Sequence, residues 1–464
     1  MDTADAARNI GPGHRYLVGV GPAELLSKLH DAQTWWATIS VLVEAWHRRV
    51  HPTGSPWVGD DDDFEQYGRL LVDIEHDLGP VEPGGPTAHQ RDVLADALAD
   101  NAHWRLAAVV EAIDQRCHEV FCADWLSAHP EPWVPAPGEL YPVPSWVGPA
   151  DWPYSRNPAN FTNRPDEFPH VRVYAPDLGV TVPVEILFDP TAEAELDAAL
   201  TEPEVLATIH PNDTWTDISM RHGPSAYPIV PTTDDQFERV QNAIATALAA
   251  DAQLIVAPEL CVTDEHIHQL TNWYLERGPF AVTVLGSCHT DDDGEPANVA
   301  TTCIGTTVVT HRKIVPFTSD PAGATPTREG IRPGPRRLRV LAAARYRFAT
   351  VICKDFLDAD IRHVLARAGV NVLAVPTMSV AMDTYPAEVD EHVHDTQGIV
   401  AVANNPARRS DGVRIQPGHV FGQPKRNFTH VAGPASEDPA APNVAVFRIG
   451  DAATRCIPLT EMLD

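Results

Sequence analysis

Three residues of types used in covalent catalysis follow short apolar runs in the second half of this 464-residue chain. Glu259 lies in LIVAPEL, Lys313 in VVTHRKIVPF and Cys353 in ATVICKDF. A thiol with an ordinary pKa of about 8.5 is mostly protonated at neutral pH, so a nucleophilic cysteine needs a base or positive surroundings. A glutamate supplies the base and a lysine supplies the charge. The set therefore indicates nucleophilic catalysis through Cys353.

Each of these residues is expected at the end of a strand, and open α/β sheets gather their sites at the carboxyl ends of strands. Taken singly, each has an ordinary structural explanation. Cys353 could be a small buried apolar side chain, and Glu259 could be a capping or surface carboxylate. Lys313 could belong to a solvated run of charged residues. Their order, with gaps of 54 and 40 residues, makes the joint pattern more specific than its parts.

The order PE, HRK and strand-end Cys resembles the nitrilase, or carbon–nitrogen hydrolase, superfamily over about residues 205–450. Glu329 in REGIRPG resembles that family's additional glutamate shortly before a Pro-Gly. Asn404, which ends VAVAN, resembles the strand end found downstream of the cysteine. The resemblance implies a nitrilase-like four-layer αββα sandwich that hydrolyses a small-molecule amide, nitrile or N-carbamoyl compound. It implies neither a metal nor an organic cofactor.

The residue types define a reaction sequence. Glu259 takes the thiol proton and returns it to the departing amine. Lys313 stabilises negative charge on the carbonyl oxygen or nitrile nitrogen, and the N–H of Lys354 is a second donor if the chain turns sharply after Cys353. The resemblance gives Glu329 the role of positioning the substrate and the lysine. We expect a thioester that water then attacks, while acyl transfer to another amine stays open.

The residues after Cys353 depart from the common pattern of the family. That pattern has an aromatic residue and Asp, then Phe-Pro-Glu, whereas this chain has KDFLD, with Lys354 beside the nucleophile. The C-terminal Gly-x-Ser signal also lacks its serine, in GHVFGQP. An alternative function is therefore a binding or signalling module that keeps the fold without ordinary turnover. Its N-terminal domain would then mediate a protein interaction.

Apolar residues at helical spacing dominate the N-terminal part of the chain. They predict one helix from about Pro22 to Trp46, a second over residues 64–78, and one or two helices over residues 87–126. We therefore expect residues 1–129 to form a mainly α-helical accessory domain.

Proline recurs every few residues after the predicted helices, interleaved with large aromatic residues. Residues 130–204 are expected to form an ordered, extended segment that ends in a short β-hairpin, made by residues 171–174 and 180–188. From residue 205 to 464, strands and helices alternate, which predicts an α/β domain.

The overall composition limits the kinds of molecule that this protein is expected to bind. A formal net charge of −30 without a basic tract argues against nucleic acid and anionic membrane surfaces. No apolar run approaches the roughly 20 residues that span a bilayer, and no secretory signal is recognisable. The seven cysteines show neither disulfide nor zinc spacing, so we expect a reduced, cytoplasmic protein. The family resemblance implies a homodimer or higher homo-oligomer.

Overall fold

The computed structural model describes residues 22–49, 61–99, 103–144, 170–177, 179–201, 204–212, 217–220, 225–278, 281–319, 327–379, 382–405, 418–424, 430–433, 443–451 and 453–459. The chain divides into two compact units. The first comprises Met1–Ser145 and Pro153–Ala175, and the second comprises Trp146–Trp152 and Pro176–Asp464.

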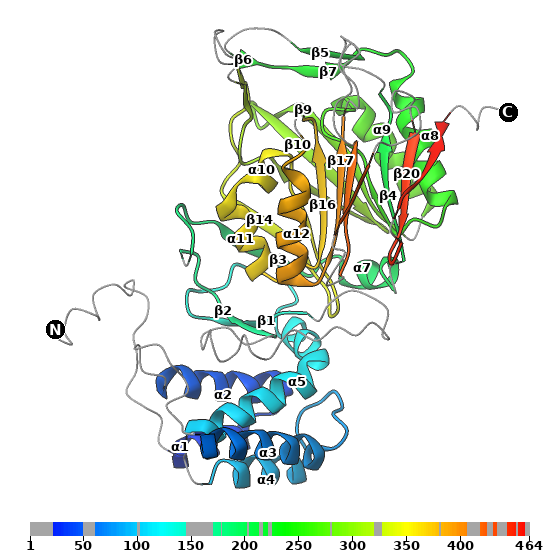
Figure 1. Ribbon diagram of the computed structural model, residues 1–464. Helices are drawn as coiled ribbons and strands as arrows, with labels where there is room; N and C mark the ends of the chain where they lie inside the picture. The colour runs from blue at the N-terminus through cyan, green and yellow to red at the C-terminus, as the bar shows by residue number, and fades with distance from the viewer. Residues whose placement is uncertain are drawn as a thin grey trace. The chain divides into compact units, whose positions relative to one another are not determined.

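Helices dominate the described part of the first unit (Figure 1). They are α1 (Pro22–Asp31), α2 (Trp35–Arg49), α3 (Asp61–Leu78), α4 (Ala88–Ala97) and α5 (His103–Ala128). Helices α2 and α3 both pack against α5. Trp35, Ile39 and Ile113 lie in their common core and are fully buried. Burial of such side chains is the main favourable term in the folding of a small helical unit.

The prediction of one helix from Pro22 to Trp46 is wrong, because the chain breaks between α1 and α2. The Thr34 hydroxyl accepts a hydrogen bond from the Ala37 N–H at 3.0 Å, which starts a new helix. The stretch from residue 87 forms two helices, α4 and α5. Thr87 starts the first of them through a reciprocal capping box with Gln90.

The expected hairpin between residues 171–174 and 180–188 is also wrong. Strand β2 (Val171–Val173) pairs with β1 (Leu140–Pro142), and β3 (Glu185–Asp189) pairs in parallel with β14 of the second unit. Alternating side chains specify which face of a strand is buried but not which strand becomes its neighbour. Trp133, in the proline-rich segment, stacks on His129 of the first unit. Residues 145–169 of that segment lie outside the described part of the chain.

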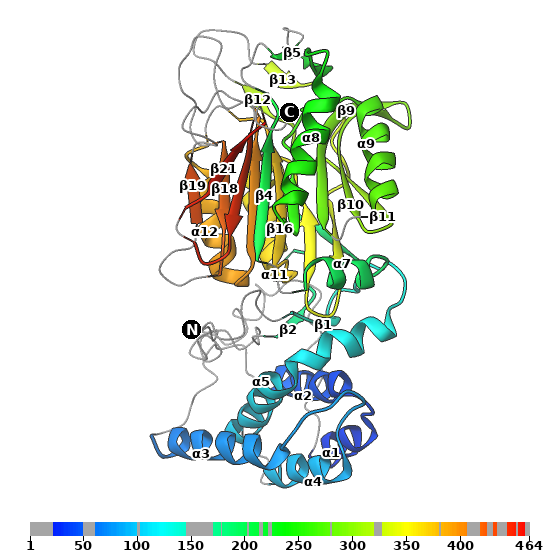
Figure 2. The same ribbon diagram turned by 90° about the vertical axis from the view of Figure 1, so that its right-hand side faces the viewer.

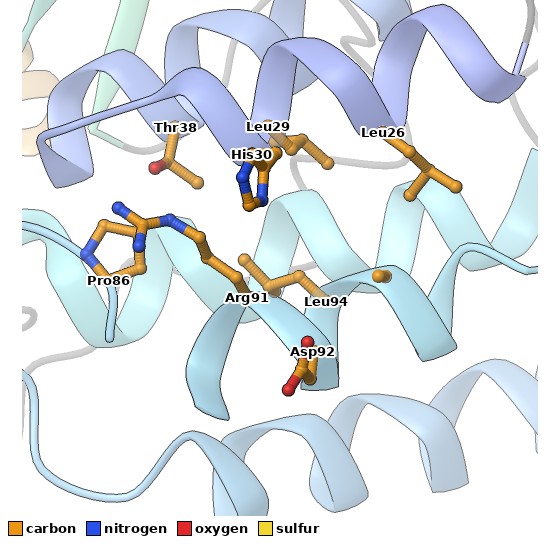
Figure 3. Close-up of a pocket in the computed structure, with 9 residues that line it drawn as sticks. Leu26, Leu29, His30, Thr38, Pro86, Arg91, Asp92 and Leu94 are labelled. Carbon is orange, nitrogen blue, oxygen red and sulfur yellow. The ribbon is translucent and has the colours of Figure 1, made fainter. Parts of the chain in front are cut away.

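A cavity of about 100 Å³ lies in the first unit (Figure 3). Its lining comes from α1, α2, α4 and the loop before α4: Leu26, Leu29, His30, Thr38, Pro86, Arg91, Asp92, Leu94 and Ala95. The Arg91 guanidinium donates to the Ala32 carbonyl at 3.0 Å, which ties α4 to the end of α1. No residue of the predicted catalytic set lines this cavity.

Two seven-stranded sheets organise the described part of the second unit. The first sheet has the order β11 (Thr307–Arg312), β10 (Glu295–Ile304), β9 (Val282–Asp292), β8 (Leu254–Val256), β4 (Val205–His210), β20 (Asn443–Arg448) and β21 (Arg455–Pro458). The second has the order β19 (His430–Gly433), β18 (His419–Gly422), β17 (Ile399–Asn404), β16 (Val372–Thr377), β15 (Arg347–Thr350), β14 (Arg337–Ala342) and β3. Short strands lie beside them: β5 (Ile218–Met220), β6 (Ser225–Ala226), β7 (Ile229–Pro231), β12 (Thr318–Ser319) and β13 (Thr327–Glu329).

The two sheets face each other, with helices on the outside (Figures 1 and 2). Residues of both sheets, such as Leu254 and Val372, share one buried apolar cluster. Helices α8 (Gln236–Ala249) and α9 (Asp264–Arg277) cover the outer face of the first sheet. Three more helices follow the second sheet in the chain: α10 (Lys354–Leu357), α11 (Ala359–Arg367) and α12 (Tyr385–Thr396). Helix α12 packs on β17 and β18, and α11 packs on α12.

The α/β character predicted for this part of the chain is confirmed. The second sheet also takes in β3, and α7 (Glu193–Ala199) packs on β10, so both elements precede the expected start of the domain at residue 205. Strands β4, β8 and β9 run parallel, as do β15, β16 and β17. Parallel strands bring their carboxyl ends to one edge, where the predicted site residues lie. Within the described part of the chain, no helix has the length and apolar character needed to cross a bilayer.

Candidate active site

Glu259, Lys313, Glu329 and Cys353 are brought together in the second unit. Glu259 follows β8, Lys313 follows β11, Cys353 follows β15, and Glu329 is the last residue of β13. Every one of the four is at most 5% exposed. Buried charged groups need partners, since an unpaired charge in an apolar interior costs several kcal/mol or more. The site must therefore satisfy these charges internally.

Lys313 joins the two glutamates. Its Nζ donates to Glu259 Oε1 at 2.6 Å and to Glu329 Oε2 at 2.7 Å. Asn298, in the middle of β10, repeats the connection, because its Nδ2 donates to Glu259 Oε1 at 2.9 Å and to Glu329 Oε1 at 2.8 Å. One cation and one amide therefore fix the separation of the two carboxylates.

Glu329 has two further donors. His289 Nε2 lies 3.1 Å from Glu329 Oε1, and the Phe317 N–H donates to Oε2 at 3.0 Å. The Ile229 N–H donates to His289 Nδ1 at 2.9 Å, so the imidazole proton is on Nε2 and points at the carboxylate. Four donors on one carboxylate make Glu329 a fixed anion.

The carboxylate of Glu259 faces both the lysine and the thiol. Its Oε2 accepts the Met378 N–H at 2.9 Å, and the Cys353 thiol lies close enough to this carboxylate to affect its pKa. The backbone before Glu259 passes close to β9, where Gly286 has φ +91° and a Cβ would lie 2.7 Å from the Pro258 carbonyl oxygen. Only glycine allows this approach without strain.

Cys353 occupies a sharp turn between β15 and α10. Its φ and ψ are 48° and −101°, a combination that non-glycine residues rarely adopt and that costs on the order of 1–3 kcal/mol. The Cys353 N–H donates to the Pro376 carbonyl at 3.0 Å, which fixes the turn against the neighbouring strand. Helix α10 begins at Lys354, whose side chain is exposed. The backbone N–H of Lys354, rather than its ammonium group, is thus the group that lies beside Cys353.

Asp355 connects the loop after Lys313 to the cysteine turn. Its carboxylate accepts hydrogen bonds from Ile314 N at 3.0 Å, Val315 N at 2.7 Å, Ile352 N at 3.2 Å and His311 Nε2 at 3.1 Å. Its side chain is fully buried. Since these donors flank both Lys313 and Cys353, Asp355 sets the position of the lysine relative to the sulfur.

The surroundings push the pKa values of the two glutamates apart. Burial raises the pKa of Glu329, but Lys313 and the hydrogen bond from His289 outweigh it and lower this pKa to about 2. Burial raises the pKa of Glu259, and Lys313 opposes that increase without cancelling it. Burial lowers the pKa of Lys313, yet the two carboxylates hold it well above its ordinary value. Burial and the charge of Glu259 raise the pKa of Cys353 to about 12.

The arrangement therefore contains a neutral thiol, a permanent ammonium, a permanent carboxylate and a carboxylate tuned for proton transfer. A pair of carboxyl groups with separated pKa values is the usual mark of divided acid–base roles. Among the described residues, no group of three or more His, Cys, Asp or Glu side chains is placed to hold a metal ion.

Three residues of this arrangement were missed from the sequence. They are His289 and Asn298, on the long strands β9 and β10, and Tyr385, whose hydroxyl lies 3.5 Å from Cys353 Sγ. None of them follows an apolar run or belongs to a motif, so no local signal marks them. Asn404, which was expected at a strand end, accepts the Thr377 hydroxyl at 2.9 Å and supports the loop after β16.

No protein-family model and no curated protein matches this chain. Solved structures similar to it include an amidase from Nesterenkonia sp., with 16% identity and a TM-score of 0.38 over 53% of this chain and 90% of that chain. A mutant of the Nesterenkonia AN1 amidase from the nitrilase superfamily has 17% identity and a TM-score of 0.38, over 54% of this chain and 91% of that chain. A second mutant, with the acetamide moiety of fluoroacetamide added covalently at its active site cysteine, has 16% identity and a TM-score of 0.39 over 54% and 91%. Similarity at this level does not establish an activity for this chain.

Proposed function

We propose that the second unit hydrolyses a non-peptide carbon–nitrogen bond of a small molecule through a thioester on Cys353. The observation that carries this proposal is the buried convergence of a thiol, a tuned carboxylate and a lysine. Lys313 Nζ lies 2.6 Å from Glu259 Oε1, and the Cys353 thiol lies beside the same carboxylate. A nucleophile, its base and a cation are then in mutual reach, as covalent catalysis requires.

In the first half of the reaction, Cys353 Sγ attacks the amide carbon and its proton passes to Glu259. The carbonyl oxygen becomes an oxyanion that Lys313 Nζ and the Lys354 N–H stabilise. When the intermediate collapses, the C–N bond breaks and the leaving nitrogen takes the proton from Glu259. An acyl thioester and a free amine or ammonia result.

In the second half, a water molecule attacks the thioester carbon and gives one proton to Glu259. The C–S bond breaks, the acyl group leaves as a carboxylic acid, and the proton returns from Glu259 to Cys353 Sγ. Because the pKa of Cys353 is raised to about 12, no stable thiolate precedes substrate binding. Proton transfer must therefore accompany the attack, which is why Glu259 needs a pKa above the ordinary value.

Glu329 holds the lysine throughout this cycle. It accepts no proton at neutral pH because its pKa is lowered to about 2. We assign it the role of fixing Lys313 Nζ and shaping the acyl side of the site, since its carboxylate stays ionised and accepts hydrogen bonds from Lys313, His289, Asn298 and the Phe317 N–H.

The test compares Cys353→Ala with Cys303→Ala, a second fully buried cysteine that lies on β10 among the residues facing α9. A panel of amides, nitriles and N-carbamoyl compounds is screened for ammonia or amine release, and intact mass spectrometry looks for an acyl adduct. We expect Cys353→Ala to abolish both signals and Cys303→Ala to keep them. If Cys353→Ala retains turnover, the proposal is refuted. If the wild-type protein shows neither turnover nor an acyl adduct on Cys353, the alternative function, a binding or signalling module, is favoured instead.

A further inference from the structure

Tyr385 lies beside Cys353, and the proposed reaction does not use it. It is the first residue of α12, and its ring is fully buried. Its hydroxyl lies 3.5 Å from Cys353 Sγ, within hydrogen-bond distance for a sulfur acceptor. A buried tyrosine hydroxyl needs a polar partner. Here the sulfur supplies one.

We propose that Tyr385 is a further catalytic residue, which donates a hydrogen bond from its hydroxyl to Cys353 Sγ that strengthens whenever the sulfur carries negative charge. This inference rests on the proposed hydrolase function. It assigns the tyrosine to the two steps in which charge builds on sulfur, namely the attack on substrate and the departure of sulfur from the acyl group.

The donor directions around the sulfur support this role. The Glu259 carboxylate lies beside the thiol as the group that takes its proton, which leaves the sulfur lone pairs available to a donor. Tyr385 is that donor, on a side chain that comes from a different element. A proton moving from sulfur to Glu259 thus leaves a sulfur that already has the tyrosine hydrogen bond in place.

Tyr385 is held in this position from two sides. Its ring stacks against Phe356 of α10, the helix that follows the nucleophile, with centroids 6.3 Å apart and an interplanar angle of 24°. The Thr377 hydroxyl, at the end of β16, also hydrogen bonds with Tyr385. A preorganised donor needs no rearrangement during the reaction, which is the condition for effective electrostatic stabilisation.

The strength of this hydrogen bond depends on the charge of the sulfur. The Tyr385 hydroxyl donates its one proton toward Cys353 Sγ. A thiolate is a stronger acceptor than a neutral thiol, and hydrogen bonds to charged groups are roughly twice as strong as neutral ones. An interaction that is stronger with the charged sulfur lowers the barrier instead of merely stabilising the resting enzyme.

The protonation states agree with a donor role. Burial, followed by the charge of Cys353, raises the pKa of Tyr385 well above its ordinary value, so its hydroxyl keeps its proton in the working range. Burial and the charge of Glu259 raise the pKa of the Cys353 thiol, while Lys313 and the hydrogen bond from Tyr385 oppose that increase. Removal of the phenol oxygen should therefore make the thiolate harder to form.

The first experiment measures alkylation of Cys353 by iodoacetamide in the intact protein at about pH 8, resolved by peptide mass spectrometry. Tyr385→Phe keeps the ring and removes the donor. A lost hydrogen bond to a charged group reduces the thiolate fraction about tenfold to a hundredfold. Since a thiolate of higher pKa is also the better nucleophile, the net alkylation rate should fall about threefold to tenfold.

The matched control is Tyr274→Phe, which removes another buried phenol hydroxyl, one that donates to the Ala281 carbonyl on the far side of the first sheet. It should leave the Cys353 alkylation rate unchanged. Equal rates in the wild type and Tyr385→Phe would overturn the assignment. A fall of the same size in Tyr274→Phe would also overturn it, because the effect would then be a general loss of stability.

A second variant keeps the test decisive if Tyr385→Phe does not fold. Replacement of Tyr385 by 3,5-difluorotyrosine retains the ring and hydroxyl but makes the hydroxyl a stronger donor. Alkylation of Cys353 should then be faster than in the wild type, whereas slower or unchanged alkylation contradicts the proposal. Alkylation requires no substrate, so this result is separate from the loss of turnover in Cys353→Ala that tests the hydrolase function.

Discussion

Replacement of Glu329 by Gln perturbs the hydrogen bonds of the site without changing its volume. The amide oxygen of Gln can take the place of Glu329 Oε1 and accept from His289 and Asn298. The NH₂ group would then occupy the place of Oε2, where Lys313 Nζ and the Phe317 N–H both donate. The buried Lys313 and Phe317 donors would then face the NH₂ group, which is itself a donor. The lysine would also lose one of its two carboxylate partners.

The magnitude follows from two independent arguments. Breaking a buried ion pair by removing one partner costs about 3–5 kcal/mol. The pKa of Glu329 is lowered from 4.5 to about 2, and at about 1.4 kcal/mol per pKa unit this difference corresponds to about 3 kcal/mol of native-state stability. We therefore expect Glu329→Gln to reduce the free energy of unfolding of the second unit by about 3–4 kcal/mol at neutral pH.

The sign of the pH dependence is also fixed. The folded pKa of Glu329 lies below its unfolded value, so its contribution is fully present above pH 4.5 and is lost as the pH falls toward 2. The difference in stability between the wild type and Glu329→Gln should thus shrink across this interval. The assay is urea unfolding at each pH followed by pulse labelling of Cys303, a fully buried thiol of β10 that becomes reactive only when the second unit opens. The label is 4,4′-dithiodipyridine, an aromatic disulfide that also reacts with thiols in acid.

Glu185→Gln is the matched control. Glu185 pairs with Arg337 at 2.7 Å, but both side chains are about half exposed. Exposed ion pairs contribute about 0–1 kcal/mol, so this variant should unfold at nearly the wild-type urea concentration. The reasoning is refuted if Glu329→Gln is no less stable than Glu185→Gln, or if its deficit is the same at pH 3 as at pH 7.

Two further substitutions test how the site is supported. Four donors now bind the Asp355 carboxylate, and in Asp355→Asn some of them would face an NH₂ group instead of an oxygen. We therefore expect the free energy of unfolding in urea to fall by about 2–4 kcal/mol and the alkylation rate of Cys353 to change. Wild-type stability together with wild-type alkylation would exclude this support role. Gly286→Ala places a Cβ 2.7 Å from the Pro258 carbonyl oxygen, and should lower stability by about 2 kcal/mol more than Gly294→Ala, whose φ is also positive but whose Cβ would meet nothing within 4 Å. Equal losses in the two glycine variants would show that strain, and not the close approach, dominates.

The sequence by itself located the residues that we propose to carry the chemistry. Glu259, Lys313 and Cys353 each follow a short apolar run, which the alternation of strands and helices in this part of the chain marks as a strand. The runs before Glu259 and Cys353 form fully buried strands, whereas the run before Lys313 forms the partly exposed strand β11. A polar residue directly after a buried strand must leave the sheet at its edge. The α/β character of the second unit follows from the same alternation of strands and helices. These are local properties, so neighbouring residues determine them.

Other features depend on which segments become neighbours in space. The expected hairpin failed because β2 and β3 pair with distant strands, β1 and β14. Asn298 and His289 act on the glutamates only because β9 and β10 bring them beside β13, and neither differs in sequence from an ordinary strand residue.

Tyr385 shows the same limit most clearly. Its hydroxyl meets Cys353 Sγ because α12 begins beside the end of β15, at a position 32 residues further along the chain. Hydrogen bonds of this kind have no periodicity in the sequence, since they depend on the distance between side chains and not on their spacing along the backbone. The sequence pointed to the residues that we propose as the nucleophile, its base and its lysine. The tertiary structure alone decided which buried donors hold them and set their pKa values.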